Sequence, residues 1–137
     1  KRPLGCMLVD VDNFKTINDS YGHDVGDLVL KQVSQAIKSG LRAQDVVCRT
    51  GGDEFTVICP ETDLRAALVC AERVRREVIA LKFADGIAHL TCSLSIGVAV
   101  RDASTGDIDA LLKRADEGVY LAKQRGRNRV ATVQALA

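Results

Sequence analysis

A Gly-Gly turn between two short apolar runs constrains the fold of this chain more than any other feature. Residues 46–48 lead into Gly51 and Gly52, and residues 55–59 lead out. Two glycines between strand-like segments are typical of a β-hairpin, because glycine enters positive φ values freely. A hairpin pairs its strands antiparallel, so the sheet that contains it is not all parallel.

The pattern of apolar residues predicts the other elements. Five short apolar segments are expected to be strands: 4–9, 46–50, 54–59, 90–100 and 129–133. Apolar residues at helical spacing indicate three helices: from Val25 to Gly40, from an N-cap at Thr62 to about Ala80, and from the turn at 105–107 to Gly126. The polar segment 10–24 is expected to be a loop or short helical turns. The order β-α-β-β-α-β-α-β predicts an α+β fold, with three helices on the faces of one mixed sheet.

Composition limits the class of protein. The 137 residues suit one domain, and no apolar run approaches the length that spans a bilayer. The net charge of +1 argues against a nucleic acid polymer or an anionic membrane as the partner. The five cysteines are odd in number and include no CxxC pair, which favours small core residues in a reducing compartment. The start at residues 1–3 leads directly into the first strand, so we expect an N-terminally trimmed domain.

Two acidic clusters suggest a metal site. Asp10 and Asp12 end the first strand, and Asp53 and Glu54 follow the glycines. We expect Asp10 and Asp12 to point in opposite directions, so that only one of them faces the hairpin. Asp10, the carbonyl of Val11, Asp53 and Glu54 form an all-oxygen set that suits Mg²⁺ and phosphoryl transfer. Solvated acidic loop residues are an equally open interpretation.

Four further polar groups have both a functional and a structural interpretation. The backbone at 13–15 can form an anion nest with Lys15 beside it, or Lys15 is an ordinary exposed lysine. The polar segment 18–27 can read guanine through an amide and a carboxylate, or cap the next helix. The basic cluster at 123–129 can hold a triphosphate, or complement a helix dipole. Arg42 and Asp45 can fork onto a nucleotide, or form a surface ion pair of little energetic value.

Taken together, the order and spacing of these segments resemble one family. Residues 10–27, 49–55, 91–97 and 115–128 match the signature segments of the GGDEF domain of bacterial diguanylate cyclases. The resemblance covers essentially the whole chain. Thr50 stands where the family usually has Tyr or Trp, and we expect little effect on the chemistry. The family's preceding helix is absent, which we expect to weaken GTP binding or stability.

The resemblance implies a palm-like fold with a central five-stranded sheet flanked by helices, as in nucleotidyl cyclases. The implied reaction joins two GTP into cyclic di-GMP and releases two pyrophosphates, with two copies of the domain facing each other about a two-fold axis. Two Mg²⁺ ions in each half-site are implied, with Mn²⁺ as a possible substitute. The implied location is the bacterial cytoplasm, and the full-length protein can carry an upstream regulatory module or a membrane tether.

The resemblance also assigns residues to roles. Implied catalytic residues are Asp53, Glu54 and Lys15, and implied metal ligands are Asp10, Val11, Asp53 and Glu54. Implied substrate-binding residues are Asn13, Phe14, Asn18, His23, Asp27, Gly51, Gly52, Lys123 and Arg127. An implied inhibitory site for the product cyclic di-GMP comprises Arg42, Asp45 and Arg73.

Two other functions remain open at this point. One is a catalytically silent receptor for GTP or cyclic di-GMP, although such relatives usually lose the acidic residues that this chain keeps at Asp53 and Glu54. The other is a palm-fold nucleotidyl transferase that uses DNA or a different nucleotide. The near-neutral charge argues against DNA.

Overall fold

The computed structural model describes residues 2–84, 86–102 and 105–136. Its elements are β1 (Leu4–Val11), α1 (Phe14–Tyr21), α2 (His23–Gly40), β2 (Val46–Arg49), β3 (Glu54–Pro60), α3 (Leu64–Ile79), β4 (Leu94–Val100), α4 (Ile108–Gln124) and β5 (Arg129–Ala131). The five strands form one sheet in the order β2-β3-β1-β4-β5. Only β4 and β5 pair in parallel, so the sheet is mixed, as expected.

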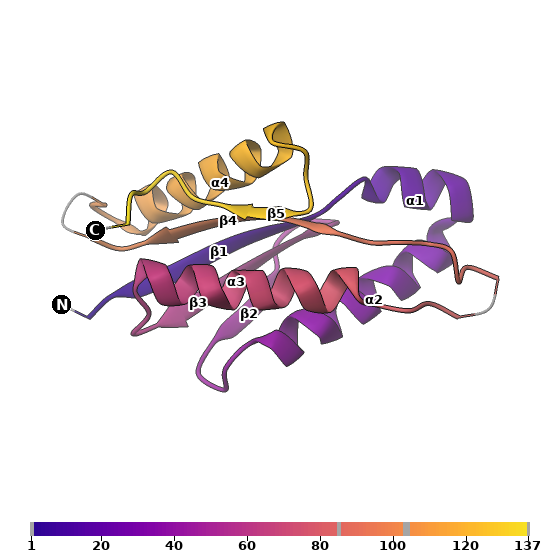
Figure 1. Cartoon of the computed structure of the whole chain (residues 1–137), viewed down its shortest axis with the longest axis horizontal. Coiled ribbons are helices and arrows are strands. Elements are labelled where there is room, and N and C mark those ends of the chain that lie inside the picture. The colour runs from indigo at the N-terminus through magenta and orange to yellow at the C-terminus, as the bar shows by residue number, and fades with distance from the viewer. Residues whose placement is uncertain (1, 85, 103–104, 137) are drawn as a thin grey trace.

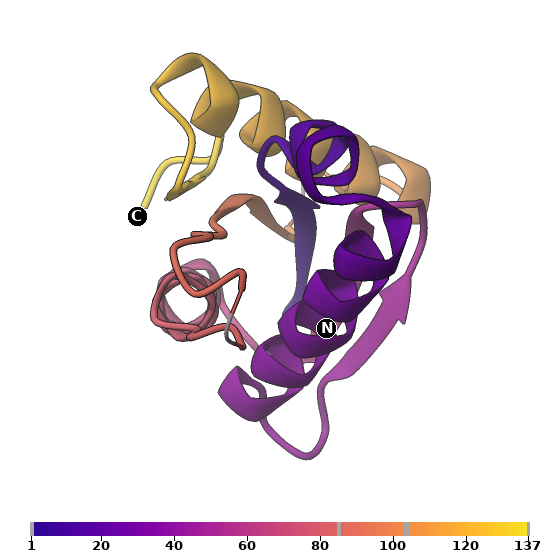
Figure 2. The ribbon, with the colours of Figure 1, turned by 90° about the vertical axis from the view of Figure 1, so that its right-hand side faces the viewer.

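The helices cover the sheet on both faces (Figures 1 and 2). α2 and α3 lie on one face, where Met7 and Val9 of β1 join the larger apolar core. α4 lies on the other face, where Cys6 and Leu8 pack against Leu111. Residues of β1 therefore alternate between the two cores, as the period of a strand requires.

Two glycines let α4 approach the sheet closely. A Cβ on Gly97 of β4 would lie 1.9 Å from the carbonyl oxygen of Ala115, and one on Gly118 would lie 2.8 Å from the Cα of Gly97. These are backbone atoms of packed elements, so neither position has room for a side chain. The close approach fixes the line of α4 across the sheet and hence the position of its C-terminal end.

The α+β class and the mixed five-stranded sheet are confirmed, with differences at the level of single elements. The prediction of three helices was wrong, because the polar segment after β1 contains the eight-residue helix α1, whose Phe14 and Ile17 are buried one turn apart. The N-cap of α3 is Asp63, not Thr62: the Asp63 carboxylate accepts from the N–H of Ala66 at 2.9 Å. β4 begins at Leu94 and β5 ends at Ala131, so both strands are shorter than predicted.

The cysteines are all free. Cys6, Cys59, Cys70 and Cys92 are buried, in line with the expectation of core residues, whereas Cys48 on the edge strand β2 is exposed. None of the helices in the described parts of the chain is long and apolar enough to cross a lipid bilayer.

Candidate active site

The end of β1 and the Gly-Gly hairpin meet at one edge of the sheet, namely the edge where β1 ends and the turn from β2 to β3 lies. Asp10 is the cross-strand neighbour of Glu54 on one side and of Ser95 on the other. The N–H of Val11 donates to the carbonyl oxygen of Asp53 at 3.0 Å. The two acidic clusters seen in the sequence therefore lie side by side, and backbone hydrogen bonds fix their relative position.

The hairpin is confirmed, but the prediction that its glycines adopt positive φ values was wrong. Neither Gly51 nor Gly52 has a positive φ. A Cβ added to Gly51 would lie 3.2 Å from the Cβ of Glu54, whereas a Cβ added to Gly52 would meet open space. The Arg49 side chain stabilises the turn, because its guanidinium donates to the carbonyl oxygens of Gly51 at 3.2 Å and Gly52 at 2.6 Å. The glycines thus leave the turn free of side chains beside the carboxylates.

Asp10 and Asp12 lie on the same face of the sheet, so the prediction that they diverge was wrong. Residues two apart in a strand share a face, and both carboxylates contact groups at the α4 side. Asp10 forms an ion pair with the ammonium of Lys123, near the end of α4. Asp12 accepts from the N–H of Asn128 at 3.0 Å, in the turn that follows α4.

The electrostatics of Asp10 reflect this crowding. Burial raises the pKa of the Asp10 carboxyl above its ordinary value, and the hydrogen bond and charge of Lys123 oppose that shift. The charges of Asp53 and Asp12 add to the rise in the Asp10 pKa. Negative charge is therefore concentrated at this edge, and Lys123 neutralises only part of it.

Asp12 is a structural anchor that the sequence did not reveal. Its buried carboxylate accepts from the hydroxyls of Ser93 at 2.7 Å and Ser95 at 2.6 Å, in addition to Asn128. These bonds tie β1 to β4 and to the turn before β5. Two serines two residues apart share a strand face, but no local pattern in the sequence pairs them with Asp12. Because Asp12 is fully engaged, Asp10 is the aspartate of β1 that faces the hairpin carboxylates.

A divalent cation at this edge needs ligands in addition to those of the protein. Within residues 2–84, 86–102 and 105–136, no three His, Cys, Asp or Glu side chains are grouped to hold a metal. The available donors are the Asp10, Asp53 and Glu54 carboxylates and the Val11 carbonyl. Mg²⁺ commonly takes one or two carboxylates and completes its octahedron with phosphate oxygens and water. The donor set thus suits an ion that arrives with a nucleotide.

The segment after β1 presents backbone N–H groups beside this edge. Asn13 adopts the left-handed conformation, with φ of 54°, and is the N-cap of α1. Phe14 is buried, whereas Lys15 is exposed. The N-terminal end of α1 therefore follows directly after the acidic end of β1, with Lys15 exposed in its first turn.

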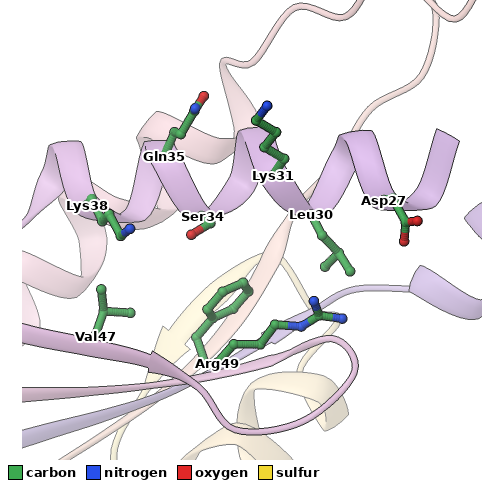
Figure 3. A pocket seen from close by; sticks show the side chains of 9 residues that line it. Asp27, Leu30, Lys31, Ser34, Gln35, Lys38, Val47 and Arg49 are labelled. Atoms are coloured by element: carbon green, nitrogen blue, oxygen red, sulfur yellow. The ribbon is translucent and has the colours of Figure 1, made fainter. Parts of the chain in front are cut away.

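Asn18 and Asp27 belong to α1 and α2, which pack against each other. The Asn18 side chain lies against Gly26, where an added Cβ would fall 1.8 Å from its Oδ1. Asp27 is exposed and lines a pocket of about 690 Å³. Figure 3 shows α2 as one wall of this pocket, with Val47 and Arg49 of β2 on the other side. His23 is the first residue of α2 and is exposed.

The basic residues at the C-terminal end of α4 and in the turn after it divide into two groups. Lys123 points to Asp10, as described above. Arg127 is exposed, and its backbone, with φ of 63°, donates to the carbonyl oxygen of Ala122 at 3.0 Å. This bond closes the turn at the end of α4.

The Arg42–Asp45 turn lies at the opposite end of β2 from the hairpin. Asp45 accepts from the backbone N–H of Arg42 at 2.8 Å and from its Nη2 at 3.1 Å. The same Arg42 guanidinium contacts the Thr62 hydroxyl and the carbonyl oxygen of Pro60. Arg73 does not join this ion pair, because its Nε donates to the carbonyl oxygen of Gly40 at 2.9 Å. Of the three residues expected at an inhibitory site, Arg42 and Asp45 therefore pair with each other, and Arg73 contacts Gly40 close to them in the chain.

Comparison with known proteins decides the family. Residues 1–129 match the family model described as "Diguanylate cyclase, GGDEF domain". This chain belongs to the GGDEF domain family. It is 48% identical over 130 residues to the response regulator PleD of Caulobacter vibrioides, a match that covers 93% of this chain and 29% of PleD. The GGDEF chain thus spans less than a third of that relative's length.

Two solved structures place the fold in the same family. The active GGEEF domain of a diguanylate cyclase from Vibrio cholerae superposes with a TM-score of 0.91 at 32% identity, covering 98% of this chain and 85% of that one. The GGDEF domain of DgcB from Caulobacter crescentus, solved in complex with c-di-GMP, gives a TM-score of 0.86 at 29% identity. The match covers 94% of this chain and 77% of the DgcB chain. The fold inferred from the resemblance is therefore confirmed.

Proposed function

We propose that this GGDEF domain is the catalytic domain of a diguanylate cyclase, which joins two GTP into cyclic di-GMP and releases two pyrophosphates. The observation that carries the proposal is the meeting of Asp10, the Asp53–Glu54 hairpin and Lys123 at one edge of the sheet. Carboxylates and a lysine held together by backbone bonds suit a triphosphate that arrives with a divalent cation.

We assign each residue a role that suits its place in the candidate site. Asp10, the Val11 carbonyl, Asp53 and Glu54 would hold two Mg²⁺ or Mn²⁺ ions in each half-site. Bound Mg²⁺ would lower the pKa of the attacking 3′-hydroxyl and offset charge on the phosphates. Glu54 and Asp53 keep the hydroxyl and the α-phosphate at the same edge. Lys15 sits beside the backbone N–H groups of Asn13 and Phe14 and contributes a point charge to the phosphates.

The remaining substrate contacts extend along the edge. Lys123 and Arg127 bind the β- and γ-phosphates, so that Lys123 exchanges Asp10 for phosphate oxygens when GTP enters. Asn18 and Asp27 hydrogen-bond the guanine edge between α1 and α2, with His23 beside them. Gly51 and Gly52 let the ribose and phosphates approach the backbone of the turn.

One domain of this size binds one GTP in this scheme, so the second GTP comes from a second copy of the domain facing the first about a two-fold axis. Cyclic di-GMP binds at the Arg42–Asp45 turn, with Arg73 alongside, and inhibits the enzyme. The prepared ion pair at Arg42 and the cyclic di-GMP complex of the related DgcB support this assignment. The chain spans 29% of PleD, and we propose that it acts in the cytoplasm as the catalytic part of a longer regulated protein.

Incubation with GTP and Mg²⁺ tests the activity. We expect cyclic di-GMP and two pyrophosphates for each cyclic product, measured by liquid chromatography and a coupled pyrophosphate assay. Asp53→Asn should abolish turnover because it removes a metal ligand while the hairpin backbone keeps its bonds. Asp109→Asn, at an exposed position of α4 outside the signature segments, is the matched control and should retain activity. Bound GTP without product in the wild type would instead favour a silent receptor.

A further inference from the structure

The turn between α4 and β5 contains three consecutive residues with positive φ. Gly126, Arg127 and Asn128 have φ values of 116°, 63° and 48°. Glycine adopts such values freely and asparagine tolerates them, but in an arginine they are uncommon and cost free energy. Backbone of this kind persists only where the surrounding structure stabilises it. The turn therefore depends on its neighbours to keep the backbone of Arg127 in place.

Three neighbouring elements contact this turn. The N–H of Arg127 donates to the carbonyl oxygen of Ala122 on α4 at 3.0 Å. The N–H of Asn128 donates to the buried Asp12 carboxylate of β1 at 3.0 Å. The third contact comes from α3, where the Nη1 of Arg75 donates to the side-chain Oδ1 of Asn128 at 2.8 Å. β5 begins directly after Asn128 and contacts α3, so this last hydrogen bond lies where the two elements meet.

The orientation of the Arg75 guanidinium is fixed within α3. Its Nε and Nη2 donate to the two carboxylate oxygens of Glu72, three residues earlier, at 2.8 Å and 2.7 Å. A bidentate pair of this kind fixes the plane of the guanidinium, so the remaining Nη1 is directed at Asn128. Arg76 pairs with the same carboxylate through its Nε at 3.0 Å, but its side chain is 73% exposed. The two adjacent arginines therefore share Glu72 and differ in the contact with the turn.

We propose that Arg75 is a positioning residue for the phosphate-binding turn at residues 125–128, and that it acts through the side chain of Asn128. The inference rests on the proposed function, in which Arg127 binds the β- and γ-phosphates of GTP. Without Arg75, Asn128 keeps its bond to Asp12 but loses the partner of its side chain. The turn then leaves its positive-φ conformation more often, and Arg127 is less often in place for the phosphates. The loss therefore falls on the phosphate tail of the nucleotide and not on its base.

Amide hydrogen exchange in the nucleotide-free chain tests the positioning directly. In Arg75→Gln, the backbone N–H groups of Arg127 and Asn128 should exchange about 3- to 10-fold faster, as expected for one lost hydrogen bond, while those of the sheet keep their rates. Arg76→Gln is the matched control, because it removes an equal charge and a partner of Glu72 from the same helix. Its exchange rates in the turn should equal those of the wild type.

Nucleotide binding tests the consequence for the substrate. Calorimetry with Mg²⁺ gives the affinities of a non-hydrolysable GTP analogue and of GMP, which lacks the β- and γ-phosphates. Arg75→Gln should weaken binding of the GTP analogue about 3- to 10-fold and that of GMP less than about twofold. Arg75→Lys keeps the charge but lacks the planar fork, so it should show the same loss. Equal weakening of both ligands would overturn the proposal, as would full affinity in Arg75→Lys.

Asn128→Gly tests the same contact from its other side, and it serves if the Arg75 variants fail to fold. Glycine permits the positive φ and keeps the N–H that Asp12 accepts, so only the side chain that Arg75 contacts is lost. The loss should again be specific to the GTP analogue, and no larger in the double variant with Arg75→Gln. A wild type that binds neither ligand would refute the proposed nucleotide site and this role together. Wild-type binding of both ligands, with unchanged exchange and affinity in Arg75→Gln and Asn128→Gly, would refute the role of Arg75 alone.

Discussion

The contact between Asn18 and Gly26 offers a way to test the base contact proposed for Asn18 without changing Asn18 itself. In Gly26→Ala, the new Cβ would fall 1.8 Å from the Asn18 Oδ1, 3.0 Å from its Cγ and 3.3 Å from the Cζ of Phe14. The first two atoms belong to the end of a flexible side chain. We therefore expect the Asn18 amide to swing away while the helices keep their places.

The expected magnitudes separate binding from stability. Losing the Asn18 hydrogen bonds to guanine would cost about 1–3 kcal/mol, which weakens GTP binding about 5- to 150-fold. Stability should change little, because alanine gains about 1 kcal/mol over glycine in a helix, which offsets part of an overpacking cost of about 1–3 kcal/mol. The free energy of unfolding should thus stay within about 2 kcal/mol of the wild type.

Titration calorimetry with a non-hydrolysable GTP analogue and Mg²⁺ measures this effect, with urea unfolding as the stability control. Asn18→Ala should weaken binding to a similar degree. The double variant should be no weaker than either single variant, because both remove the same interaction. Full GTP affinity in Gly26→Ala, or additive losses in the double variant, would refute the role of Asn18 in base recognition.

Three other perturbations test separate parts of the structure. Arg42→Ala should relieve inhibition by cyclic di-GMP about 10- to 100-fold, since a charged hydrogen bond is worth about 1.5–3 kcal/mol; an unchanged inhibition constant in steady-state kinetics would count against the product site. Gly97→Ala should destabilise the fold by about 3 kcal/mol or more, because its Cβ meets the Ala115 carbonyl; a wild-type midpoint in urea would contradict the close packing of α4. The hydrogen bond from Arg75 is the main cause that lowers the pKa of Glu72. Glu72→Gln should therefore be less stable than the wild type above pH 4.5, and the two proteins should become equally stable as the pH falls through the lowered pKa of Glu72. At 36% side-chain exposure the loss should be about 0.2–1 kcal/mol at pH 7, and a constant difference across the pH range in thermal melts would be evidence against the pair.

Much of the fold could be predicted because its signals are local. The apolar runs on either side of Gly51 and Gly52 specify the hairpin, and helical spacing specifies α2, α3 and α4. α1 was predicted only as loop or helical turns, since its two buried residues are too few for a clear period. The prediction of the N-cap at Thr62 failed because a neighbouring Asp63 serves the same purpose.

The candidate residues of the site could be chosen from the sequence, but their contacts could not. The sequence shows that Asp10 and Glu54 are acidic, but only the register of β1 and β3 makes them cross-strand neighbours. The engagement of Asp12 with Ser93 and Ser95 joins residues more than 80 positions apart, which no local pattern specifies. Long-range pairing of this kind depends on the packing of the whole sheet.

The central claim is that two copies of this domain join two GTP. The most direct test is the initial rate of cyclic di-GMP formation against chain concentration, at saturating GTP and Mg²⁺ and with the monomer fraction followed by sedimentation. While monomers dominate, the rate should rise with the square of the chain concentration and become linear once dimers dominate. A specific activity that stays constant across the monomeric range would contradict an active site shared between two domains.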